Sequence, residues 1–81
     1  MEDPVYKIAE IVGTSSSSVE KAIENALTRA GETLRNIQWF EVVQTRGSIG
    51  SRQQIQYQVV LKIGFALEIL PIDPPLNIDL P

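Results

Sequence analysis

Hydrophobic and polar residues alternate over a long stretch in the second half of the chain. From Ile55 to Ile69 every second residue is apolar, and most of the residues between them are polar or small. A period of two residues is typical of a β-strand with one apolar face. The pattern therefore predicts a strand over 55–69, longer than the usual length of about five to six residues.

Two earlier segments are rich in β-branched and aromatic residues and also predict strands. The first is Val5–Val12, which lies between a proline and a glycine, and the second is Ile37–Thr45. Both carry apolar residues on both faces. The segment Arg46–Gln53 contains glycine and serine residues and predicts the turn that joins the second strand to the third.

A helix is predicted between the first two strands. Thr14–Ser18 is a run of hydroxyl residues that can cap a helix, and Ser17 with Glu20 has the spacing of a capping box. Apolar residues then recur at steps of three and four as far as Leu34. We expect the helix to end near residue 36 and to continue through Gly31, at a cost of about 1 kcal/mol relative to alanine.

The order strand, helix, strand, strand predicts an α+β subunit. A right-handed crossover makes the first two strands parallel, with the third between them and antiparallel to both, in the order 1-3-2. One helix covers one face of this sheet, so the apolar residues on the other face predict a surface for partners. Residues 1–70 form this single domain. Residues 71–81 hold four of the five prolines and predict an extended or disordered tail.

Composition narrows the possible functions. The 81 residues include no cysteine and no histidine, which excludes disulfides, the usual zinc sites and catalysis by a His base or Cys nucleophile. A domain this small without such supports is expected to associate with copies of itself. The net charge of −3, without a basic cluster, argues against nucleic acid. With no membrane span or secretory signal, we expect a cytoplasmic protein. The lack of a candidate nucleophile and base predicts that it is not an enzyme.

Three residues are candidates for binding a planar ligand. The indole of Trp39 can stack on an aromatic ring, or it can be a core residue. The amide of Gln58 presents a donor beside an acceptor, as the pyrimidine edge of a flavin requires, or it can be a solvated strand residue. The guanidinium of Arg46 can bind a phosphate, or it can be a surface charge near a turn.

At these residues the chain resembles the dodecin family. The resemblance covers Val5 to Leu67 and rests on the segments VYKIAEIVGTSSSS, TLRNIQWFEVVQTRGSI and IQYQVVLKIGFALE. It implies a β-α-β-β subunit that assembles with eleven copies into a hollow homododecamer. It also implies that flavins lie at subunit contacts, stacked between tryptophans at Trp39 and held at the pyrimidine edge by Gln58.

The resemblance further implies which flavin is bound. Arg46 matches a position suited to the phosphate of FMN, so FMN is the expected cofactor, with riboflavin or another flavin as alternatives. Gln38, Gln44 and Ser48 match positions that approach the ligand. Ala66 stands in GFALE where the family commonly has GFRLE, which makes coenzyme A a doubtful second ligand.

Two functions are compatible with these features. The first is a protein that stores or buffers flavin and quenches its fluorescence. The alternative is a shell-forming assembly module that has lost flavin binding. An enzyme that uses the flavin for redox chemistry ranks last, because the sequence supplies no candidate proton donor or substrate pocket.

Overall fold

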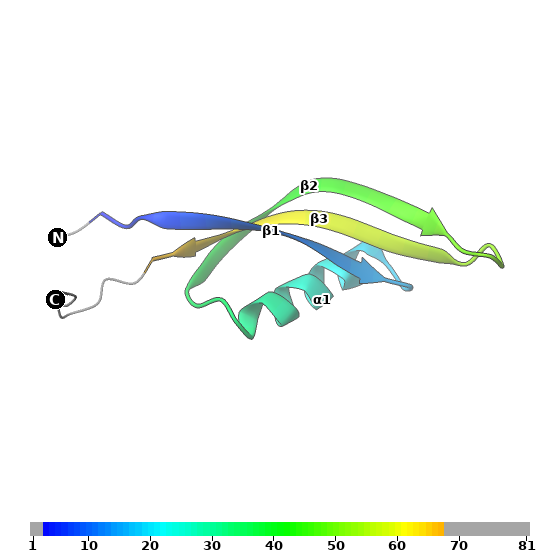
Figure 1. The fold of residues 1–81 in the computed structure, drawn as a ribbon, viewed down its shortest axis with the longest axis horizontal. Coiled ribbons are helices and arrows are strands. Elements are labelled where there is room, and N and C mark those ends of the chain that lie inside the picture. The colour runs from blue at the N-terminus through cyan, green and yellow to red at the C-terminus, as the bar shows by residue number, and fades with distance from the viewer. Residues whose placement is uncertain (1–2, 68–81) are drawn as a thin grey trace, which may run out of the picture.

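A computed structural model describes residues 3–67 as one sheet with a helix on one side (Figure 1). The elements are β1 (Tyr6–Ser15), α1 (Val19–Gly31), β2 (Ile37–Ile49) and β3 (Ile55–Ala66). The sheet has the order β1-β3-β2, and both neighbours of β3 are antiparallel to it. The predicted α+β fold and strand order are confirmed. The tail 71–81 and the predicted end of the third strand lie outside the described residues.

The helix begins one residue later than the predicted capping box. Ser18 is the N-cap, and its side chain accepts a hydrogen bond from the backbone N–H of Lys21 at 3.0 Å. Ser15 supports the preceding turn, since its Oγ accepts from the N–H of Ser17 at 2.9 Å. The prediction of Ser17 as the cap is therefore wrong, although the hydroxyl run does cap the helix.

The helix also ends earlier than predicted, at Gly31 rather than near residue 36. The N–H of Leu34 still reaches the carbonyl of Ala30 at 2.8 Å, and Leu34 packs against the core. Asn36 has a φ of 62°, a left-handed conformation that redirects the chain into β2. The apolar stripe thus predicts which residues pack but not where the backbone leaves the helix.

The turn between β2 and β3 is shorter than predicted. It spans only Gly50 to Gln54, whose backbones are joined by a 2.7 Å hydrogen bond from the N–H of Gly50 to the carbonyl of Gln54. Arg46 and Ser48 therefore belong to β2 and are paired with β3. Local turn residues are overridden here by the long β3, which supplies backbone partners as far as Ile55.

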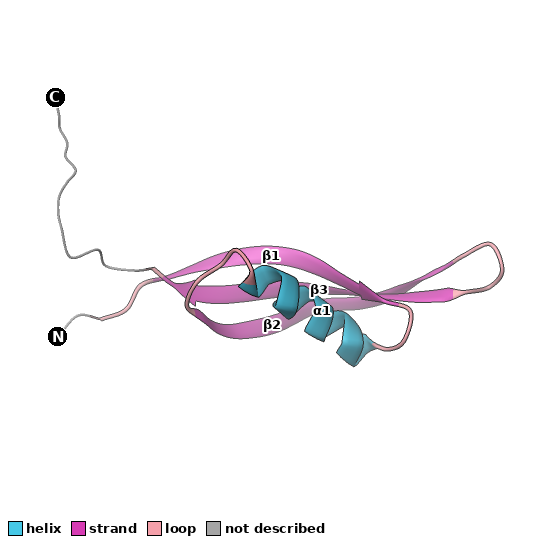
Figure 2. Ribbon diagram, turned by 90° about the horizontal axis from the view of Figure 1, so that it is seen from below, coloured by secondary structure: helices cyan, strands magenta, loops and turns pink. Residues whose placement is uncertain are grey.

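The helix α1 lies against one face of the sheet (Figure 2), and the core lies between the two. It joins three helix alanines to apolar residues of β3, and its buried members are Ala22, Ala26, Ala30, Val59, Leu61 and Ile63. A Cβ added at Gly13 would overlap the backbone of Ala22 and the side chain of Ala26. Because Gly13 of β1 and the alanines of α1 are small, the helix can pack directly against β1 without a gap.

The helix leaves much apolar surface uncovered. It packs mainly against β1 and β3, so Phe40 of β2 is 44% exposed although its backbone pairs with buried Ile63. Phe40 is therefore not part of the buried core of a single subunit. On the other side of the sheet Ile8 and Val12 are also about half exposed. These surfaces are what the sequence predicts for a subunit that associates with copies of itself.

Candidate functional site

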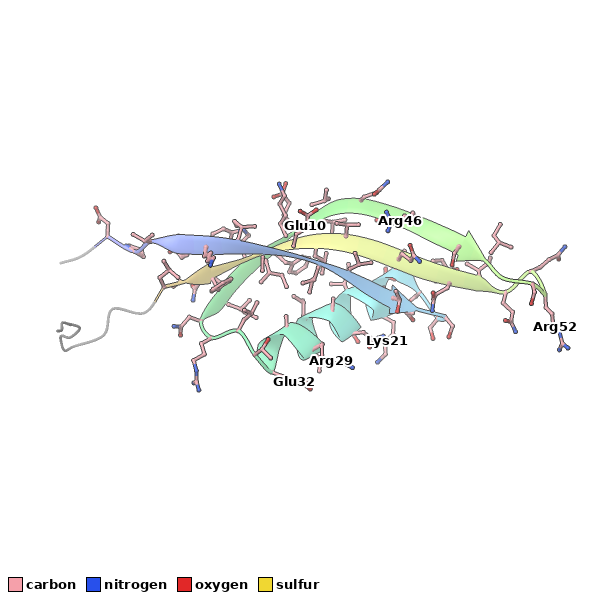
Figure 3. All side chains as sticks on the ribbon, in the orientation of Figure 1. Glu10, Lys21, Arg29, Glu32, Arg46 and Arg52 are labelled. Atoms are coloured by element: carbon pink, nitrogen blue, oxygen red, sulfur yellow. The ribbon has the colours of Figure 1, made fainter. Side chains whose placement is uncertain are left out.

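The face of the sheet turned away from α1 carries the predicted site residues. We call it the open face. Figure 3 shows Glu10 and Arg46 on this side and Lys21, Arg29 and Glu32 on the helix side. Residues that pair across antiparallel strands share a face, so the register between the strands identifies the other members.

Arg46, Gln58 and Gln44 form a polar cluster on the open face. Arg46 and Gln58 are direct cross-strand partners. The Nε–H of Arg46 donates to Oε1 of Gln58 at 2.7 Å, and Nη1 donates to Oε1 of Gln44 at 3.2 Å. The structure thus brings together three of the six predicted residues. Arg46 lies within β2 and is oriented by two glutamines.

The polar cluster keeps free capacity for a ligand. A guanidinium has five N–H donors, of which the two glutamines use two. The carbonyl oxygen of Gln58 has a second lone pair, and its amide group still has both N–H donors. The cluster can therefore offer donors to an anionic group and, through Gln58, a donor beside an acceptor.

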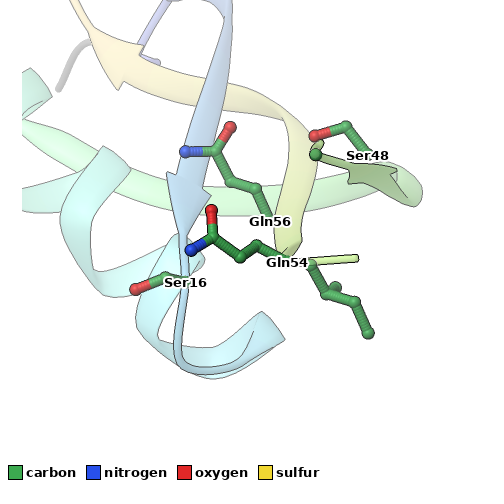
Figure 4. Close-up of a pocket in the computed structure, with 6 residues that line it drawn as sticks. Ser16, Ser48, Gln54 and Gln56 are labelled. Atoms are coloured by element: carbon green, nitrogen blue, oxygen red, sulfur yellow. The ribbon is translucent and has the colours of Figure 1, made fainter. Parts of the chain in front are cut away.

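Ser48 lies next to the polar cluster, near the end of β2. It pairs with Gln56, one step beyond the pair of Arg46 and Gln58 on the same face. Ser48 also borders a pocket beside the turn of the β2–β3 hairpin (Figure 4). The pocket is lined by Ser16, Ser48, Gly50, Gln54, Ile55 and Gln56. Ser48 is thus the one predicted site residue in that pocket.

Trp39 reaches the open face because β2 is irregular near its start. Ile37 pairs with Phe65 and Trp39 with Gly64, so Gln38 is an extra residue in the strand. In a regular strand residues 37 and 39 would share a face. The bulge instead lets Ile37 pack against the core while Trp39 faces away from the helix. Gln38 itself donates to the carbonyl of Asn36 at 3.4 Å.

A second irregularity puts Trp39 and Arg46 on the same face. They are seven residues apart, an odd separation that places two residues on opposite faces of a regular strand. Val42 pairs with Leu61 and Gln44 with Val60, so Val43 is a second extra residue. This bulge changes the alternation once and brings both side chains to the open face.

The indole of Trp39 is available to a ligand. It is 40% exposed, so it is not a core residue of the subunit. The ring of Tyr6 borders it at 4.9 Å between centroids, with the ring planes at 71°. Because the two rings do not stack in parallel, Tyr6 is a neighbour that supports the indole from the side.

Trp39 and the polar cluster are far apart within one subunit. Trp39 pairs with Gly64 and Arg46 with Gln58, which are six residues apart along β3. At about 3.3 Å per residue, this separation is about 20 Å. A charged row lies between them, in which Lys62 pairs with Glu10 on one side and with Glu41 on the other. This backbone separation favours a flavin that contacts Trp39 of one subunit and Gln58 of another.

Sequence reasoning missed two residues of this face, Tyr6 and Gly64. The signal was present, because Gly64 interrupts the polar positions of an alternating strand, where a glycine often marks a close approach.

Among residues 3–67 there is no group of histidine, cysteine, aspartate or glutamate side chains that could hold a metal. The helix in this part of the chain is too short and too polar to cross a membrane.

Comparisons with known proteins agree on one family. A family model described as Dodecin matches residues 5–68. Dodecin from Thermus thermophilus is 55% identical over 64 residues, which cover 79% of this chain and 93% of that protein. Calcium dodecin from Mycobacterium tuberculosis is 32% identical over 63 residues, which cover 78% of this chain and 89% of that protein.

Solved structures show the same likeness in three dimensions. The crystal structure of the tt0972 protein from Thermus thermophilus has a TM-score of 0.78 at 51% identity and covers 84% of this chain and 100% of its own. Dodecin from Streptomyces coelicolor has a TM-score of 0.79 at 48% identity and covers 86% of this chain and 100% of its own.

Proposed function

Because this chain belongs to the dodecin family, we propose that it stores or buffers FMN, which it holds and quenches between its subunits. Dodecins are small binding proteins, not enzymes, and they bind flavins. Their fold implies a homo-oligomer of twelve copies. FMN, the hollow shell and the roles of individual residues are our proposal, and riboflavin is the alternative ligand.

The separation between Trp39 and the polar cluster is the observation that carries the proposal. The indole is exposed, and the backbone positions of Gln58 and Arg46 lie about 20 Å along the sheet on the same open face. A flavin that stacks on Trp39 and also pairs with Gln58 is therefore best placed between two copies. Association of open faces supplies the missing half and also buries exposed residues such as Ile8 and Val12.

Each residue then has a distinct role. Trp39 stacks on the isoalloxazine ring, and Gln58 of a second copy pairs with its pyrimidine edge. Arg46 binds the phosphate of FMN, and Gln44 holds the guanidinium in place through its 3.2 Å hydrogen bond. Gln38 and Ser48, at the two ends of β2, approach the ligand from the sides. A location in the cytoplasm stays a prediction of the sequence.

A fluorescence titration tests the proposal. FMN at fixed concentration is mixed with increasing assembled protein, and we expect its emission to fall to a plateau because the nearby indole donates an electron to the excited flavin. Emission that is unchanged at saturating protein would contradict flavin binding. The absorption spectrum of freshly purified protein is a second readout, since bound flavin is yellow.

The assembly module without flavin is the second candidate. It is favoured by Ala66, which pairs with Tyr6 on β1 and places a methyl group where the GFRLE pattern has an arginine. The same change argues against coenzyme A as a second ligand. A protein that sediments as a dodecamer, is colourless and does not quench FMN would support this candidate.

A further inference from the structure

Trp39 lies against the backbone of β3 at Gly64, and this contact requires a glycine. A Cβ added at Gly64 would be almost equally close to three adjacent atoms of the indole, Cε2, Cζ2 and Cη2. Equal closeness to three adjacent ring atoms means that the face of the six-membered ring, not its edge, covers Gly64. The indole of Trp39 therefore extends from β2 across β3 and lies flat on the sheet.

The ring of Tyr6 lies beside the indole of Trp39, on the side of β3 away from β2. It belongs to β1 and pairs with Ala66, two residues along β3 from Gly64. Its ring lies 4.9 Å from the indole between centroids, at an angle of 71°. The indole thus has one face on the backbone of Gly64 and a second aromatic ring inclined to it, while Trp39 stays 40% exposed.

We propose that Gly64 and Tyr6 are positioning residues that hold the indole of Trp39 flat on the sheet, so that only its outer face is offered to a flavin. This inference rests on the proposed function. A ring that is held before the ligand arrives loses less conformational freedom on binding, so its orientation contributes to affinity. A side chain at Gly64 lifts the indole from the sheet and narrows the space for a ligand between two copies.

The test compares the assembled wild-type protein with Gly64→Ala and uses FMN as the probe. Trp39 is the single tryptophan of the chain, so the indole emission and near-ultraviolet circular dichroism report its position without flavin. We expect Gly64→Ala to change both signals and to raise the Kd for FMN by about tenfold, within the range for loss of a stacking platform.

Gly47→Ala is the matched control. Gly47 is likewise a strand glycine, in β2, and a Cβ there would meet its nearest neighbour, the carbonyl oxygen of Gln56, at an ordinary 3.5 Å. It should leave the indole signals and the Kd unchanged. In a Trp39→Ala background, Gly64→Ala should have no further effect on the Kd, whereas a general structural role of Gly64 would weaken binding in both backgrounds.

The outcomes separate this proposal from the proposed function. If wild-type protein does not bind FMN, the proposed function fails, while the indole signals of Gly64→Ala still test the position of the ring. If wild-type protein binds FMN and Gly64→Ala changes neither the signals nor the Kd, the positioning role is overturned.

A second pair of variants keeps the test decisive if Gly64→Ala does not assemble. Tyr6→Ala should raise the Kd for FMN by about three- to tenfold, because the indole loses its lateral support. Tyr6→Phe keeps the ring and should restore the wild-type Kd. Equal Kd values for the wild-type protein, Tyr6→Ala and Tyr6→Phe would overturn the role of Tyr6. If Gly64→Ala also does not assemble, this result would overturn the proposal itself.

Discussion

The two faces of the sheet each use a glycine to admit a close neighbour, but with different results. At Gly13 the neighbour is the backbone of α1, and this side contains the buried core. At Gly64 the neighbour is the indole of Trp39, which stays 40% exposed. The helix face is thus completed within one subunit, whereas the open face needs further copies to cover it. Substitutions on the two faces should therefore affect different properties.

The largest effect on stability is expected on the helix face, for Leu61→Ala. Leu61 is fully buried between α1 and the sheet. Its truncation leaves a cavity and should lower the free energy of unfolding by about 2–5 kcal/mol. Thermal unfolding at one fixed protein concentration measures this, because stability in an oligomer depends on concentration. A loss below about 1 kcal/mol would mean that the core is not as tightly packed as the structure shows.

On the open face, Trp39→Ala should affect binding rather than stability. Removing the indole should weaken FMN binding by about 1–3 kcal/mol, the range for loss of a stacking platform. Sedimentation should still show the assembled protein, since the indole is not part of the core of a subunit. Dissociation into folded monomers would mean instead that Trp39 is primarily a residue of the subunit interface.

A smaller effect, specific for one ligand, is expected for Arg46→Gln. Loss of the guanidinium should weaken FMN binding by about 1 kcal/mol. The affinity for riboflavin should stay the same, because riboflavin has no phosphate. Gln58→Ala is the matched comparison and should weaken both ligands equally, since both have the same pyrimidine edge. Isothermal titration with each flavin distinguishes the two patterns. Equal losses for both flavins in Arg46→Gln would remove the phosphate role.

Much of the fold can be predicted from the sequence because β3 alternates without interruption. Its register then fixes which residues of β1 and β2 lie on each face. The extension of β2 through Gly47 and Ser48 could not be predicted, because both residues favour turns locally and are held in the strand only by pairing with β3. The early end of α1 was missed for a similar reason, since Leu34 packs in the core from outside the helix.

The candidate site was predicted as residues rather than as an arrangement. Trp39, Gln58 and Arg46 were identified by the chemistry of their side chains, and the bond between Arg46 and Gln58 follows only from the register of the hairpin. The close approach of Trp39 to Gly64 depends on the extra residue at Gln38, and a bulge has no reliable local sequence signal. The chemistry of the side chains therefore identifies the candidate binding groups, whereas the pairing of the strands determines which of them lie together.

The extra residue at Val43 makes the site depend on the parity of a residue count. Trp39 and Arg46 occupy one face because an odd separation is combined with a single break in the alternation. A loss or a gain of one residue between them makes the separation even, and a common face then requires either no break in the alternation or two. The length of this short segment, as much as the identity of its residues, thus determines whether stacking and hydrogen-bonding groups can serve one ligand.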